Sequence, residues 1–160
     1  MVKFNISTII NQNPEIVWKA FIDPQNMIHW TRFLEKVEII KGKLGEIGAI
    51  SHLHYLEKGR SYILEDKLLS YEEGKRIESQ VSGQGLNIIV ETILESHPKG
   101  TKISMTWNGT SKSFFTRIIL KLMQGKISKN AKSELDTFKS LVEKYGVSFS
   151  DHDLGRKLIP

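Results

Sequence analysis

Apolar residues recur every three or four positions from Ser113 to Tyr145, and this pattern predicts one long C-terminal helix. Ser113 is a suitable N-cap, and Gly146 stands where a glycine commonly ends a helix. The apolar positions of the second half are Ile127, Ala131, Leu135, Phe138, Leu141, Val142 and Tyr145. Those of the first half are Phe115, Ile118, Ile119, Leu122 and Met123.

The two apolar stripes of this helix do not share one face. At about 100° per residue, the apolar direction swings by roughly a third of a turn between the halves. Gly125 lies at the junction, where glycine costs about 1 kcal/mol relative to alanine. We therefore expect a bend or a local break there, and a large curved partner to cover the helix.

The preceding part of the chain predicts strands and two short helices. Alternation of apolar and polar residues over 2–10 predicts a half-buried strand. Asn13-Pro14 and Asp23-Pro24 each place proline at the start of a short helix. From Lys36 to Trp107, short alternating runs separated by turn residues predict an antiparallel meander of six strands.

The turns of this meander predict its register. A two-residue hairpin at Lys58-Gly59 puts Glu57 opposite Arg60. It also pairs Tyr55 with Tyr62, Leu53 with Leu64, His52 with Glu65, and Ser51 with Asp66. Turns at Glu73-Gly74, Gln84-Gly85 and Pro98-Lys99 continue the same apolar face. On the outer face Glu78 meets Glu91, and we expect a one-residue bulge to separate them.

The inner face mixes apolar side chains with hydroxyls and small residues, which is typical of a ligand cavity. A core filled by its own side chains, with the hydroxyls bonded to backbone, is the alternative. The cavity hypothesis predicts these ligand-binding residues: Tyr55, Tyr62, Asp66, Ser79, Val90, Met105, Trp107, Phe115, Ile118 and Leu122.

Asp66 places a carboxyl group on this inner face, where it must find partners or take up a proton. It could orient the polar head of a ligand, or act as a general base, which makes it the one candidate for a catalytic role. It could instead bond to Ser51 or Tyr62 as a structural group, or a bulge could turn it outward.

The composition favours a single soluble domain. The chain has 160 residues and no cysteine, which excludes disulfides and thiolate chemistry. No signal-peptide pattern and no apolar run long enough to span a bilayer occur, so we expect a cytoplasmic protein. We expect the domain to cover 1–146 and a loosely packed extension to cover 147–160.

Positive charge gathers at the start of the long helix. Between Lys112 and Lys132 the chain has six basic residues and no acidic one. This stretch is either a solvated helix face or a surface that meets anionic lipid or an acidic ligand. No nucleic-acid motif accompanies the charge, so we expect no nucleic-acid binding.

His52 and His54 form an H-x-H pair, a spacing that metals sometimes use. The predicted register puts them on the solvated face with Glu65 opposite, and the sequence indicates no third clustered ligand. No nucleophile motif, P-loop or dinucleotide fingerprint occurs either. We therefore expect neither a metal nor a cofactor.

The order of these elements resembles the START-like (SRPBCC) superfamily with its helix-grip fold, above all the polyketide cyclase/dehydrase-like and lipid-transport members. The similar segments are 13–18, 23–30, the Gly45–Gly48 turn, 69–77 and 98–103. The resemblance covers Val2–Tyr145. It implies an α+β fold: a curved seven-stranded antiparallel sheet around the long helix, with two short helices after the first strand.

The resemblance also implies a deep hydrophobic cavity, so we expect a non-enzymatic binder or carrier of a lipid, sterol or polyketide-like ligand. One alternative is a polyketide cyclase, dehydratase or hydrolase with Asp66 and a cavity tyrosine as acid–base groups. Another is a chaperone-activator type of protein-interaction module, which predicts a filled interior.

Overall fold

The computed structural model describes residues 1–149 and confirms the predicted α+β architecture. The elements are β1 (Val2–Ile10), α1 (Pro14–Ile22), α2 (Pro24–Trp30), β2 (Leu34–Lys41), β3 (Ile50–Glu57), β4 (Arg60–Glu72), β5 (Arg76–Gly83), β6 (Leu86–His97), β7 (Gly100–Ser111) and α3 (Phe114–Tyr145). Asn13 and Asp23 cap the two short helices with their side chains, and a proline follows each of them, as expected.

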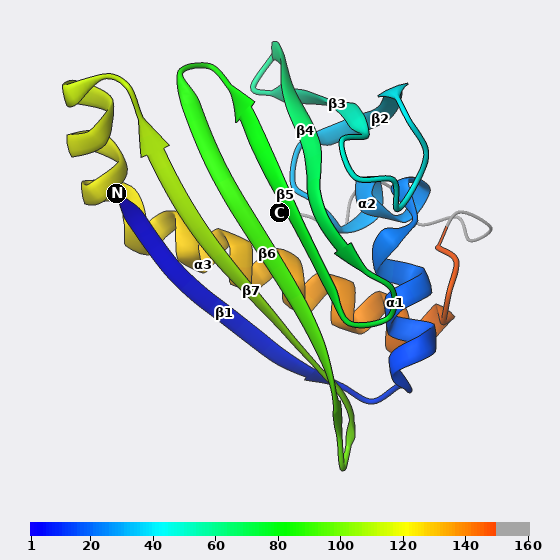
Figure 1. Ribbon diagram of the computed structural model, residues 1–160. Coiled ribbons are helices and arrows are strands. Elements are labelled where there is room, and N and C mark those ends of the chain that lie inside the picture. Colours follow the sequence, from blue (N-terminus) through cyan, green and yellow to red (C-terminus); the bar gives the residue numbers. More distant parts are fainter. Residues whose placement is uncertain (150–160) are drawn as a thin grey trace.

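The strands form one antiparallel sheet in the order β1-β7-β6-β5-β4-β3-β2. This sheet curves around α3, and α1 and α2 lie toward the C-terminal end of that helix (Figure 1). The first strand, β1, therefore pairs with the last strand, β7, and forms one edge of the sheet. Strand β2 forms the opposite edge.

The register predicted from the hairpin turns is confirmed. Glu57 lies opposite Arg60, and the same pairing continues to Ser51 opposite Asp66. Lys58 and Gly59 both have positive φ, 50° and 78°, as a two-residue hairpin of this twist requires. Because side chains alternate across a strand, a correct turn fixes which residues face the helix.

The bulge expected between Glu78 and Glu91 is wrong. The two residues are direct partners in an unbroken β5–β6 ladder. Arg76 compensates their charge, with its Nη2 at 3.1 Å from Glu78 and its Nε at 2.6 Å from Glu91. The register shifts lie elsewhere: between Leu68 and Ser70 in β4, and in β2 between Leu34 and Lys36 and between Ile39 and Lys41.

Helix α3 is helical throughout 114–145 and changes direction between its yellow N-terminal turns and its orange remainder (Figure 1). This bend agrees with the two apolar stripes that do not align. The second stripe is buried through Ala131, Leu135, Phe138, Leu141 and Val142. Within the described chain, no helix is long and apolar enough to cross a membrane.

The expected curved partner covers only the second half of α3. Phe115 remains 77% exposed and Leu122 81%, so the first apolar stripe faces solvent. The sheet packs along the helix from the side of β1, and the bent N-terminal turns extend away from it (Figure 1).

Asn26 ties α2 to the chain that follows α3. It is completely buried, and its Nδ2 donates to the carbonyl oxygens of Ala20 at 3.0 Å and Val147 at 2.7 Å. Its Oδ1 accepts the backbone N–H of Phe149 at 2.9 Å, and the Phe149 ring packs against Phe138 in the core. The packed chain thus continues past Gly146 to Phe149. The rest of the expected extension, 150–160, lies outside the described residues.

Replacing Asn26 by Ala should lower the free energy of unfolding by about 2–4 kcal/mol, because it leaves two carbonyls and one N–H buried without partners. Urea unfolding of the full chain measures this loss. The control is Asn5→Ala, which removes an exposed side-chain hydrogen bond to Thr106 and should cost much less. Equal losses in the two variants would contradict the role given to Asn26.

Candidate functional site

A cavity of about 460 Å³ lies between the inner face of the sheet, α2 and the C-terminal half of α3. The strands contribute side chains such as Leu53, Leu64, Ile77, Val81 and Ile88. Met27 and Trp30 from α2 and Asn130, Ala131 and Glu134 from α3 complete the wall. The volume falls within the range of small-molecule sites, roughly 300–1,000 Å³.

Seven of the ten predicted ligand-binding residues line this cavity: Tyr55, Tyr62, Asp66, Ser79, Val90, Met105 and Trp107. All seven come from strands whose register the turns had indicated. Phe115, Ile118 and Leu122 do not line it, because the bent N-terminal turns of α3 leave the sheet. That the seven residues contact a ligand stays a prediction.

Several cavity residues were missed by the sequence reasoning. Phe33, Ile39 and Leu44 line the cavity and are also exposed to solvent, so they form part of its mouth. Ile39 belongs to β2, and Phe33 and Leu44 belong to the connections that flank it. No two-residue hairpin turn joins β2 to β3, so the sequence did not indicate which of these side chains face inward. Glu134 lies between two apolar positions of α3, and its orientation toward the cavity depends on how the helix sits on the sheet.

Asp66 faces the cavity and hydrogen-bonds the Ser79 side chain, rather than Ser51 or Tyr62 as proposed from the sequence. Burial raises the pKa of Asp66 to about 6, although the Ser79 hydrogen bond opposes the shift. The register shift in β4 comes after Asp66, so it does not turn the carboxyl group outward.

Glu134 brings a second carboxyl group to the same cavity. Its Oε1 accepts the backbone N–H of Arg32 at 2.9 Å. Burial raises the pKa of Glu134 to about 7, and the bond to Arg32 and the Arg32 charge only partly offset this effect. At neutral pH the two carboxyl groups are therefore close to their titration points.

Tyr55 and Tyr62 stack with ring centroids 5.1 Å apart and planes within 6° of parallel. Burial, and after it the charge of Glu134, raises the pKa of the Tyr55 hydroxyl. Both phenols therefore stay protonated at neutral pH and can donate a hydrogen bond.

The cavity combines apolar walls with hydrogen-bonding groups of both kinds. The walls can bury an apolar body, the carboxyl groups can accept hydrogen bonds, and the phenols can donate them. Within residues 1–149, the only group of three His, Cys, Asp or Glu side chains close enough to share a metal ion lies on the opposite face of the sheet. The apolar walls and the hydrogen-bonding groups of the cavity together suit an organic ligand.

A second hollow of about 800 Å³ runs along the surface between β1 and α3. Its lining consists mostly of serine, lysine, asparagine and threonine side chains, including Asn5, Ser128 and Lys129. It is more open to solvent and offers less apolar surface than the cavity under the sheet, so that cavity is the better candidate for a hydrophobic ligand.

Thermal stability should fall as the pH rises through 6 and 7. The raised pKa values of Asp66 and Glu134 mean that the folded protein keeps protons that the unfolded chain has already released. This contribution is complete below about pH 4 and is lost as the pH passes the folded-state values. The double variant Asp66→Asn with Glu134→Gln should raise the melting temperature at pH 8 by roughly 5 °C or more, with little gain at pH 4.

Differential scanning calorimetry across this pH range measures the effect. The control is Glu65→Gln, which neutralises an exposed carboxylate on the outer face of β4. A decline of the same size in the double variant and in the wild type would contradict the assignment of the two carboxyl groups.

Solved structures share this fold at low sequence identity. Protein CV1439 from Chromobacterium violaceum is 16% identical, with a TM-score of 0.72 over 89% of this chain and 99% of that chain. SA2116 from Staphylococcus aureus, described as a protein of unknown function, is 14% identical, with a TM-score of 0.70 over 89% and 94%. TTHA0849 from Thermus thermophilus is 15% identical, with a TM-score of 0.68 over 88% and 96%.

No curated protein matches the sequence significantly. The family described as polyketide cyclase / dehydrase and lipid transport matches residues 1–143, nearly the whole described chain. This match agrees with the curved sheet, the long helix and the cavity between them, and it confirms the resemblance inferred from the order of elements. The chain therefore belongs to the polyketide cyclase / dehydrase and lipid transport family of START-like (SRPBCC) proteins.

Proposed function

We propose that this protein binds or carries a small hydrophobic ligand in the cavity between the sheet and α3. The observation that carries the proposal is the cavity of about 460 Å³ with a mainly apolar lining. The family description, which names lipid transport and polyketide chemistry, supports it. Burial of ligand surface at about 25 cal/mol per Å² would supply most of the affinity.

The polar groups of the cavity narrow the chemistry of this ligand. Asp66 and Glu134 accept hydrogen bonds, and Tyr55 and Tyr62 carry hydroxyl groups. A ligand with an apolar body and one or more hydroxyl groups satisfies them better than a plain hydrocarbon, because unpaired buried polar groups cost free energy. Hydroxylated sterols and polyketides have this character.

An enzyme of the cyclase or dehydratase type is the alternative that a specific observation favours. Two carboxyl groups with raised pKa values share a cavity with a stacked tyrosine pair, and such groups can exchange protons near neutral pH. The chaperone-activator alternative predicted a filled interior, and the cavity favours ligand binding over it.

We also propose that the N-terminal part of α3 contacts an anionic membrane. Six of its large apolar side chains are exposed: Phe114, Phe115, Ile118, Ile119, Leu122 and Met123. The basic residues at 112–132, with no acidic residue among them, add attraction of about 1 kcal/mol each near an anionic surface. Apolar side chains beside basic ones are the composition of helices that lie in the membrane interface.

Filling the cavity should weaken ligand binding. Purified protein should release a bound apolar compound on solvent extraction, or be stabilised in thermal-shift assays by fatty acids, sterols or aromatic polyketides. Val90→Trp places an indole in the cavity and should weaken the binding of the best probe by about tenfold or more. The control is Asn87→Trp, which adds the same ring to the outer face of the same strand.

The binding proposal would be overturned if no class of apolar compound stabilised the protein. It would also be overturned if Val90→Trp and Asn87→Trp bound the best probe with equal affinity. Asp66→Asn should weaken the binding of a hydroxylated probe more than the binding of a fatty acid. If Asp66→Asn abolished turnover of a polyketide-like substrate while leaving its binding intact, the enzyme alternative would replace simple carriage.

Membrane contact predicts co-sedimentation of the full chain with vesicles that contain phosphatidylglycerol, and little with pure phosphatidylcholine. The double variant Phe115→Ser with Leu122→Ser should weaken vesicle binding by about tenfold or more, because two exposed apolar side chains no longer enter the bilayer. Added salt should weaken the binding as well. The control is Leu56→Ser, which removes an exposed apolar side chain from the sheet. If Leu56→Ser weakened vesicle binding as much as the double variant in α3, α3 would not be the membrane contact.

A further inference from the structure

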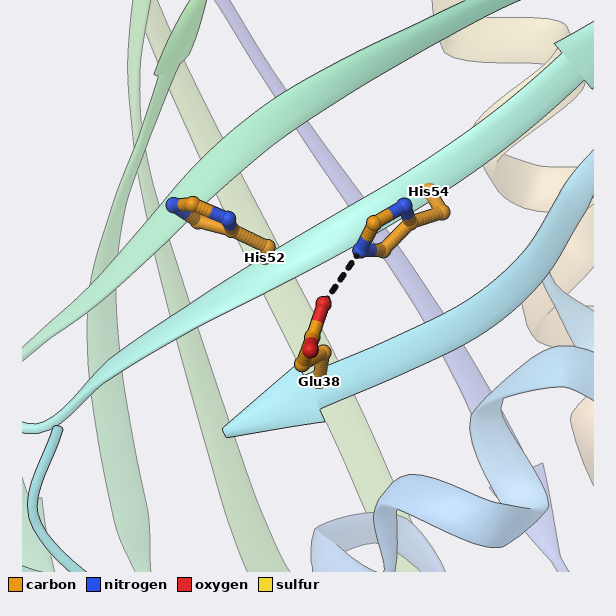
Figure 2. A group of neighbouring side chains, drawn as sticks. All are labelled: Glu38, His52 and His54. Atoms are coloured by element: carbon orange, nitrogen blue, oxygen red, sulfur yellow. Dashed lines mark hydrogen bonds and ion pairs between the residues drawn. The ribbon is translucent and has the colours of Figure 1, made fainter. Parts of the chain in front are cut away.

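Three potential metal ligands meet on the outer face of the sheet, opposite the cavity. Glu38 comes from β2, and His52 and His54 come from β3. One ligand atom of each residue lies within 4.8 Å of the other two (Figure 2). The expectation that the histidine pair has no third clustered ligand is therefore wrong.

The strand pairing explains why these residues converge. His52 and His54 are two positions apart in β3, so both point to the same face. Glu38 is the direct partner of His52 in the β2–β3 ladder, and its Oε2 lies 2.9 Å from the Nε2 of His54. Figure 2 shows the His54 ring directed at Glu38, with the His52 ring beside the pair and bonded to neither.

We propose that Glu38, His52 and His54 form a binding site for a divalent transition-metal ion of the Zn²⁺ type. Two imidazoles and one carboxylate are a donor set that zinc uses, with a fourth position left for water or another ligand. Imidazole nitrogens favour zinc and related ions over magnesium or calcium, which prefer oxygen ligands alone. The site is separate from the cavity and does not depend on the function proposed for it.

Binding requires small movements of the three side chains. Zinc–ligand bonds of about 2.0–2.1 Å place neighbouring tetrahedral ligands about 3.4 Å apart. The contact of 2.9 Å between Glu38 and His54 is a hydrogen bond that must open slightly to reach this value. The ligand atoms of all three residues lie within 4.8 Å of one another, so small rotations of these side chains complete the site. The side chains of His54 and Glu38 are 30% and 42% exposed, which leaves room for the ion to enter.

Two neighbouring charges modulate the site. Lys36 Nζ lies 3.7 Å from Glu38 Oε2 and competes with a cation for that carboxylate. Its side chain is 60% exposed and can move into solvent when the ion binds. Glu65 lies opposite His52 on β4 and adds negative charge on the other side. Removing Lys36 should therefore strengthen metal binding, and removing Glu65 should weaken it slightly.

The test is titration of the full chain, freed of any histidine tag, with Zn²⁺ by calorimetry and with Co²⁺ by visible absorption. We expect one ion per chain and Co²⁺ bands typical of low coordination number. Glu38→Gln, His52→Gln and His54→Gln should each weaken binding by about tenfold or more. Lys36→Gln should tighten it by roughly two- to fivefold.

The control is His97→Gln, at the far end of β6, which should leave the titration unchanged. Equal losses in this control and in the three ligand variants would show adventitious binding to surface histidines and overturn the proposal. Absence of a one-to-one complex would overturn it too. The cavity variant Val90→Trp should keep its metal affinity, so failure of the cavity function and failure of the metal site give different results.

Discussion

The packing of the C-terminal half of α3 against aromatic side chains from α1 and α2 is the interaction on which the rest of the structure depends. Phe138 is completely buried, and its ring lies 5.3 Å from Trp30 and 5.6 Å from Phe21. Phe149 adds a fourth ring at 6.1 Å. This cluster holds the C-terminal half of α3 against the inner face of the sheet. The cavity of about 460 Å³ lies between the curved sheet and this half of the helix.

The cavity gives the buried carboxyl groups their chemistry. Asp66 and Glu134 come from opposite walls, a strand and a helix, and burial raises the pKa of each toward neutrality. In a filled core these carboxyl groups would only lower the free energy of unfolding. In a hollow lined by tyrosines and apolar side chains they can recognise a ligand's polar groups, which is why the proposed ligand is amphipathic.

Successive side chains of a strand point to opposite faces of the sheet, and this alternation places the two proposed sites on opposite faces. Asp66 and Tyr62 point into the cavity, while His52 and His54 point away from it on the neighbouring strand. A shift of one residue in the β3–β4 hairpin would exchange the two sets and destroy both sites. The positive φ of Lys58 and Gly59 therefore supports the chemistry on both faces of the sheet.

The sequence by itself determined the order of elements, the hairpin registers and seven residues of the cavity wall, since these depend on local turns and on the two-residue period of a strand. Only the tertiary structure decided the rest. It brought Glu134 beside Arg32, left Phe115 and Leu122 in solvent, bridged Glu78 and Glu91 through Arg76, and added Glu38 to the histidine pair. Each of these depends on where a helix sits, how far the sheet curves or which rotamer a side chain adopts, and no local pattern in the chain specifies those quantities.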